Sequence, residues 1–114
     1  MNAEADDRWK HGLELFCSGR YFETHEEWEI AWGRAAREEK DFYQGMVHLT
    51  VALYQAGRGN TAGARSQMNK ARRRLAAYHP KHRGIPLEKL VPAVHQAVEN
   101  VLAGEKITNF KFEI

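Results

Sequence analysis

Residues 39–56 read EKDFYQGMVHLTVALYQA and decide the fold. At 3.6 residues per turn, this stretch is apolar around most of its circumference. Only a narrow polar strip remains, formed by Asp41, Gln44, His48 and Gln55. A helix that is apolar on nearly every side has to be covered by other elements, so we expect residues 39–56 to lie at the centre of a helical bundle.

Four further segments with helical spacing accompany the central one. They cover about residues 4–18, 21–36, 60–78 and 87–102. Gly19 and Gly57 each follow one helical segment and precede the next, a pattern that predicts two antiparallel helical hairpins. The sequence therefore predicts an all-α protein, a compact bundle of four to five helices built from such hairpins.

The chain has 114 residues, about the size of one domain. We expect a single helical domain over residues 1–114, with a C-terminal helix at about 87–103 and a short extended tail over 104–114. Phe110 and Phe112 alternate with polar residues in that tail. Aromatic residues make up 11% of the chain, and with this apolar tail they predict that the protein forms a homo-oligomer.

Composition excludes several classes of protein. Hydrophobic residues form 43% of the chain and charged residues 28%, which is typical of a globular domain. No stretch is apolar enough to span a membrane, and the single cysteine, Cys17, has no partner for an internal disulfide. The first eight residues are polar and acidic, unlike a signal peptide, so we expect a cytoplasmic, reducing location.

Residues 21–29, YFETHEEWE, carry the side chains best suited to chemistry. His25 and Glu29 lie one helical turn apart and therefore stack on one face. Trp28 and Trp32 lie on the same face, which predicts that Glu29 points into the interior. The remaining glutamates at 23 and 27 fall on the opposite side, where we expect contact with solvent.

A buried carboxylate needs a partner. If residues 21–36 and 39–56 form an antiparallel hairpin that closes near 37–40, then His48 is level with Glu29, and Gln44 with Trp32. Such a hairpin would bring side chains from both helices together. The candidate polar cluster consists of His25, Glu26, Glu29, Gln44 and His48.

Three interpretations of this cluster stay open. The one we favour is a buried polar network that fixes the packing of two helices. The second is a divalent metal site at His25, Glu29 and His48, because imidazole and carboxylate suit zinc, iron or manganese. The third is acid–base chemistry centred on His25, Glu26 and Glu29, because an interior glutamate beside a histidine titrates abnormally. The first interpretation, a structural polar network, predicts a protein without a cofactor.

Basic residues gather in the fourth predicted helix and the loop that follows it. They are Arg65, Lys70, Arg72, Arg73, Arg74, His79, Lys81, His82 and Arg83. A nucleic-acid footprint clusters on one face, whereas these arginines spread over more than half of the helix circumference. The net charge of the chain is only +2. We therefore favour a solvated helix face over nucleic-acid binding.

Three stretches resemble a known family. They are residues 19–32, 42–54 and 58–64, and the similarity extends over about residues 9–75. The family is catalogued as domain of unknown function three hundred and nine, a group of short all-helical proteins from bacteria and archaea with some plant relatives. The resemblance implies a compact helical bundle and no established activity. The positions that match the family motif are Tyr21, Glu23, His25, Glu26, Glu29, Trp32, Gln44 and Gly45.

The chain departs from the family at two positions. Tyr54 stands where the family often has histidine, and His48 where it often has another residue. This argues against a metal site that depends on either position. The sequence thus favours a small non-enzymatic interaction or scaffold protein over a metal-binding or acid–base enzyme.

Overall fold

A computed structural model describes residues 3–105. Five α-helices and two short 3-10 turns follow one another in this part of the chain, and it contains no strand. The elements are α1 (Ala3–Cys17), α2 (Tyr21–Arg34), η1 (Arg37–Glu39), α3 (Lys40–Gly57), α4 (Thr61–Leu75), η2 (Ala76–Tyr78) and α5 (Leu87–Leu102). The all-α prediction is confirmed. The predicted tail lies outside the described residues apart from its first two.

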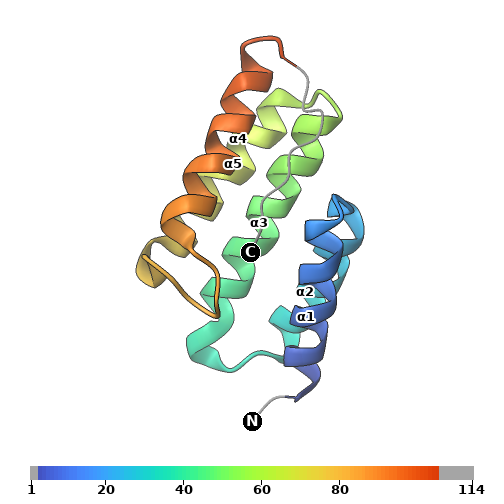
Figure 1. Ribbon diagram of the computed structural model, residues 1–114, viewed down its shortest axis with the longest axis vertical. Coiled ribbons are helices and arrows are strands. Elements are labelled where there is room, and N and C mark those ends of the chain that lie inside the picture. Colours follow the sequence, from blue (N-terminus) through green and yellow to red (C-terminus); the bar gives the residue numbers. More distant parts are fainter. Residues whose placement is uncertain (1–2, 106–114) are drawn as a thin grey trace.

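Helix α3 occupies the centre of the bundle, as its composition predicts. It lies between the α1–α2 pair and the α4–α5 pair, with α2 and α4 behind α1 and α5 in this view (Figure 1). Ten of its 18 residues are buried, and they come from most of its circumference. No helix of the described chain is long and apolar enough to cross a membrane.

Two glycine turns produce the two hairpins. Gly19 and Gly59 both have a φ near +77°, which a glycine adopts without strain. In each turn, the amide of the residue after the glycine donates to a carbonyl five residues earlier, as in Arg20 N to Leu15 O at 2.9 Å. Each turn is thus a Schellman motif that ends one helix and starts the next. Asn60 then caps α4, since its Oδ1 accepts from Gly63 N at 3.0 Å.

The interior of the α1–α2 hairpin is aromatic. Trp9 and Trp28 stack with their ring centroids 4.8 Å apart, and Trp28 Nε1 donates to the Trp9 carbonyl at 3.1 Å. Gly12 makes this approach feasible, because a Cβ there would lie 2.2 Å from Trp28 Nε1. Gly45 has the same role between α3 and α4, where a Cβ would lie 2.6 Å from Leu75 Cγ.

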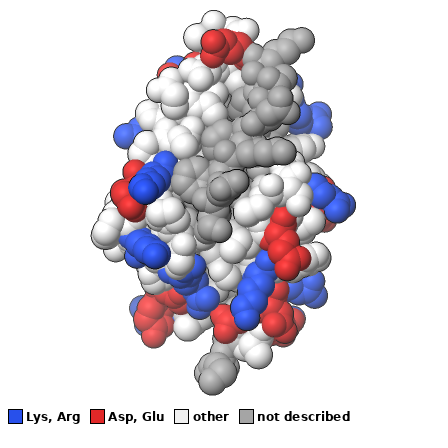
Figure 2. Space-filling view, viewed as in Figure 1, with Lys and Arg blue, Asp and Glu red and all other residues white. Residues whose placement is uncertain are grey.

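Charges are mixed over the face that carries α1 and α5. Figure 2 shows basic and acidic side chains side by side over its lower half, without a broad area of one sign. Ion pairs account for part of this pattern, such as Arg83 with Asp6 at 3.2 Å. The surface seen there does not have the uniform positive charge of a nucleic-acid footprint.

Candidate functional site

The predicted pair of His25 and Glu29 forms on α2. His25 Nε2 lies 3.2 Å from Glu29 Oε1 across one helical turn. The prediction that Glu29 is buried is wrong, however, because 57% of its side chain is exposed, against 25% for His25. The pair is therefore a partly solvated contact at the edge of α2 and not a buried network. Glu26, on its flank, is exposed as well.

The error in burial is an error of helical phase. The fully buried residues of α2 are Thr24, Trp28 and Ala31, whereas Trp32 is 39% exposed. If Trp28 and Trp32 are both taken to point into the core, the expected buried side of α2 is rotated toward Glu29. The glutamate that points inward from the opposite side is Glu27, which has only 16% of its side chain exposed because it packs against α1.

Helix α1 supplies the partners of Glu27. Arg8 donates to both of its carboxylate oxygens, at 2.9 and 3.2 Å, and His11 Nδ1 lies 3.2 Å away. The pKa of Arg8 is raised by this hydrogen bond and by the negative charge of Glu27. These contacts are a link between α1 and α2, on the side where we expected only solvent.

The predicted alignment of α2 and α3 brings four polar or aromatic side chains to one concavity. This concavity, which we call the Trp32 pocket, has a volume of about 260 Å³. Its lining residues are Glu29, Trp32, Gln44, Val47 and His48. Three of the five predicted cluster residues thus share a pocket, while His25 and Glu26 are not among its lining residues. The pocket opens on the surface between two helices, since Glu29 and Trp32 are exposed.

His48 joins α3 to α4. Its Nδ1 lies 2.7 Å from Gln67 Oε1, so Nδ1 donates and Nε2 is left as an acceptor in the neutral ring. Burial lowers the pKa of His48, and the positive charges of Lys70, Arg74 and Arg73 lower it further, while the hydrogen bond that His48 donates to Gln67 acts in the opposite direction. The imidazole is therefore mostly neutral at pH 7.

A second pocket adjoins the first at His48. This Arg74 pocket has a volume of about 410 Å³ and is lined by Asp41, His48, Lys70, Arg73, Arg74 and Ala77. Arg74 pairs with Asp41 at 2.6 Å, which leaves Lys70 and Arg73 without an ion pair in residues 3–105. One face of the bundle thus has an acidic edge, formed by Glu26 and Glu29 on α2, and a basic edge, formed by Lys70 and Arg73 on α4.

Large apolar side chains are exposed on the same helix as the acidic edge. Among the described residues, the large hydrophobic side chains that are exposed are Phe22 at 47%, Ile30 at 39% and Trp32 at 39%, and all three belong to α2. Phe22 contacts Tyr54 of α3, with ring centroids 5.5 Å apart. Sequence reasoning missed this feature, although Ile30 falls opposite Trp28 on a helical projection.

The three predicted metal ligands do not form a metal centre together. Among residues 3–105, no group of three or more histidine, cysteine, aspartate or glutamate side chains is arranged to hold a metal ion. Glu29 and His48 border the Trp32 pocket, and His25 contacts Glu29 from the next turn of α2.

A second polar centre, which the sequence did not indicate, joins the loop after η2 to the N-terminal ends of α1 and α3. Glu39 accepts hydrogen bonds from His82 Nε2 at 2.9 Å and from Arg83 Nε at 2.5 Å. Arg83 also donates to Asp6 at 3.2 Å, and its guanidinium lies 5.3 Å from the centre of the Tyr43 ring. His82 and Arg83 are more than forty residues from Glu39 in the chain, so no local spacing could reveal these two partners.

The sequence matches the family described as Domain of unknown function (DUF309) over residues 9–67. This chain belongs to that family. The match covers α2, α3 and parts of α1 and α4, so it includes every lining residue of the Trp32 pocket.

Among curated proteins, the chain is similar to an uncharacterized protein, YpuF, from Bacillus subtilis (strain 168). The two are 33% identical over 101 residues, which is 83% of this chain and 58% of YpuF. The chain thus spans little more than half the length of that relative. No solved structure matches the chain.

Proposed function

We propose that this DUF309 protein is a non-enzymatic interaction protein that pairs with a second copy of itself through the face formed by α2, α3 and α4. The observation that carries the proposal is the placement of Phe22 and Trp32, which are exposed on α2 beside α3: Phe22 contacts Tyr54, and Trp32 lines a pocket with three α3 residues. Exposed aromatic and aliphatic side chains gathered on one element are typical of protein–protein contacts.

Charge favours a second copy as the partner. The face carries an acidic edge at Glu26 and Glu29 of α2 and a basic edge at Lys70 and Arg73 of α4. Across a twofold axis, the acidic edge of one protomer lies over the basic edge of the other, and the reverse contact forms at the same time. A face with both signs on opposite edges is therefore complementary to itself.

The size of the molecule is compatible with such a dimer. Its principal extents are 45, 25 and 23 Å. A stable interface buries about 800 Å² on each partner, which one long side of a molecule of this size can supply. Trp32 would supply the anchor, because tryptophan beside a partly apolar pocket is frequent among residues that dominate binding energy.

The test uses two charge-reversed variants of the full chain. In one, Glu26→Lys and Glu29→Lys make both edges basic; in the other, Lys70→Glu and Arg73→Glu make both edges acidic. We expect the wild type to sediment as a dimer at about 100 μM and each variant alone as a monomer. An equimolar mixture of the two variants should form a heterodimer, because each basic edge then meets an acidic one.

Glu14→Lys on the exposed side of α1 is the control and should leave the dimer unchanged. A wild type that stays monomeric at about 100 μM would refute the proposal. Variants that fail to associate when mixed would also refute it, provided that each has a wild-type circular dichroism spectrum.

A second proposal is acid–base chemistry at His25, Glu26 and Glu29. It is supported by the contact of His25 with Glu29 and by the Trp32 pocket, where Glu29 and the neutral His48 border one concavity. The charge-reversal experiment discriminates the two proposals, because acid–base chemistry at Glu29 does not require two copies to associate. A wild type that stays monomeric would favour the second.

A further inference from the structure

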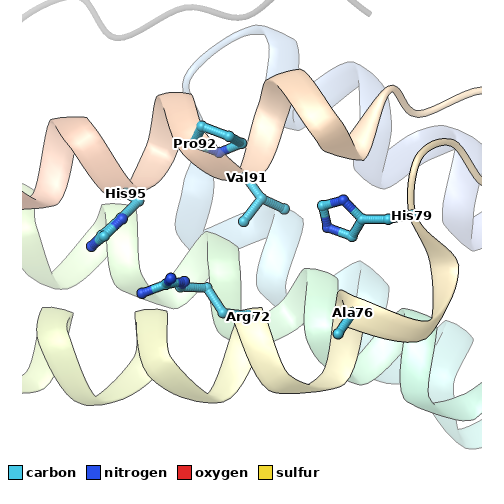
Figure 3. A pocket seen from close by; sticks show the side chains of 6 residues that line it. All are labelled: Arg72, Ala76, His79, Val91, Pro92 and His95. Carbon is cyan, nitrogen blue, oxygen red and sulfur yellow. The ribbon is translucent and has the colours of Figure 1, made fainter.

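Helices α4 and α5 enclose a pocket on a different side of α4 from the basic edge. This Arg72 pocket has a volume of about 500 Å³ and is lined by Arg72, Ala76, His79, Val91, Pro92 and His95. Figure 3 shows that Arg72 from α4, His79 from the segment after η2 and His95 from α5 all extend into the space between the two helices.

Among residues 3–105, every polar side chain that lines this pocket is basic and can donate hydrogen bonds. Arg72 supplies a guanidinium, and each imidazole donates one hydrogen bond when neutral and two when protonated. In the part of the chain that the structure describes, no carboxylate lines the pocket. His95 Nε2 lies 3.4 Å from Glu99 Oε1, one turn further along α5.

Arg72 has no ion pair within the described chain, whereas Arg74, two residues further along α4, pairs with Asp41. The negative end of the α4 dipole accounts for a preference for cations in the last turn of that helix. It does not account for His79 and His95, which come from other elements and face the same space.

The remaining lining residues are apolar. Val91 is 7% exposed and points into the space between the helices, and Ala76 and Pro92 complete the apolar part. A pocket with an apolar floor and converging cationic donors suits an anion attached to an apolar body. Its volume is that of a site for a small molecule.

We propose that the Arg72 pocket binds a phosphate monoester carried on a small apolar group. A phosphate monoester has a charge of nearly −2 at pH 7 and three acceptor oxygens, which matches three donors from three elements better than a carboxylate does. Arginine is well suited to this role, since its planar fork donates two parallel hydrogen bonds to a phosphate.

Nucleic acid fits this arrangement less well. Arg73 and Arg74 line the Arg74 pocket with Lys70, on another side of α4, so the basic side chains do not form one continuous stripe. The Arg72 pocket is enclosed by two helices and presents three donors to a single group. This arrangement is independent of the proposed dimer face, which uses the opposite edge of α4.

The probe is phenyl phosphate, titrated into the isotopically labelled full chain and followed by nuclear magnetic resonance of the histidine side chains. We expect saturable binding with a Kd of about 1 mM or tighter, with the largest shifts at His79 and His95. Phenol, which lacks the phosphate, should produce no saturable shift up to about 10 mM, and benzoate should bind at least about threefold more weakly.

Two variants and a matched control test the assignment. Arg72→Gln should weaken phenyl phosphate binding about tenfold and His95→Gln about threefold or more, because each removes a donor to the phosphate. Arg65→Gln, an exposed arginine two turns earlier on the same helix, should change the Kd less than about twofold. The spectrum of each variant also reports whether the fold is retained.

Three results would overturn the inference. The first is no saturable shift with wild type up to about 10 mM phenyl phosphate. The second is an equal loss of binding in Arg72→Gln and Arg65→Gln, which would indicate a diffuse electrostatic effect. The third is a duplex DNA that binds far more tightly than phenyl phosphate and loses affinity equally in both arginine variants, which would identify a nucleic-acid surface.

Discussion

Two carboxylate–histidine contacts in this molecule have similar lengths and different surroundings. His25 and Glu29 lie 3.2 Å apart within one helix, and Glu29 has 57% of its side chain in solvent. His82 and Glu39 lie 2.9 Å apart across 43 residues of chain, and Glu39 has 20% of its side chain in solvent. The distance alone does not distinguish them.

The difference lies in the number of partners and in burial. Glu29 has a single contact from its own helix, and an exposed pair at one-turn spacing contributes little. Glu39 accepts from both His82 and Arg83, and Arg83 extends the network to Asp6 on α1. The His25–Glu29 contact, which follows a helical spacing in the sequence, is thus local and solvated. The His82–Glu39 contact, which joins distant elements, has no signature in the sequence.

The largest expected effect is that of Glu39→Ala. The substitution leaves His82 and Arg83, whose side chains are both 29% exposed, without their shared acceptor. Removing one partner of a mostly buried polar network costs about 1–3 kcal/mol in the free energy of unfolding. Urea denaturation followed by circular dichroism measures this loss.

Glu38→Ala provides the matched control, because Glu38 is adjacent, exposed and in the same 3-10 turn. Its backbone carbonyl, which accepts from Tyr78, is unaffected by the substitution. Equal effects of the two substitutions would mean that the Glu39 network contributes nothing beyond the charge near the start of α3.

A smaller effect is expected from acid. Burial by itself raises the pKa of Glu39, but hydrogen bonds from Arg83 and His82 and their positive charges outweigh it and hold the pKa below the ordinary 4.5. A carboxyl group with a lowered folded-state pKa stabilises the protein above its unfolded-state pKa and loses that contribution as the pH falls through the folded value. The wild type should therefore lose stability below about pH 5.

The matched variant for this measurement is Glu39→Gln, which cannot ionise. Its free energy of unfolding should be lower than that of the wild type at pH 7, and the gap should narrow between about pH 5 and pH 3. Urea midpoints at several pH values test this. A gap that stays constant over the whole range would show that ionised Glu39 is not what stabilises the network.

The smallest expected effect is that of Glu29→Ala. Since Glu29 is more than half exposed, its loss should change the free energy of unfolding by no more than about 0.5 kcal/mol. Glu27→Ala should cost clearly more, because Glu27 is held by Arg8 and His11 of α1. Urea denaturation of the two variants side by side gives the order, and the reverse order would mean that the helical phase of α2 described here is incorrect.

The fold was largely predictable because its signals are local. The apolar circumference of residues 39–56 requires a central helix, and α3 occupies that place. Gly19 and Gly59 end helices through positive φ angles, a conformation that glycine adopts without strain. The alignment of α2 with α3 followed from hairpin geometry, and in the structure Glu29, Gln44 and His48 border one pocket.

Burial of particular side chains was only partly predictable. Periodicity predicted an apolar side for α2, but this helix packs against both α1 and α3, and its inward direction lies between the two. Trp28 is fully buried and Trp32 is 39% exposed, although both are tryptophans on adjacent turns. The same shift of phase exposes Glu29 and places Glu27 against Arg8.

The sequence by itself determined that this chain forms helices, where their turns occur, and which helix is central, because propensity, periodicity and glycine conformation act over a few residues. Only the tertiary structure decided which polar groups meet. Glu39 accepts from His82 and Arg83 across more than forty residues of chain, and Arg72 and His79 share a pocket with His95 from the next helix. Such contacts depend on the packing angles and register of whole helices, which many side chains set together and no single spacing records.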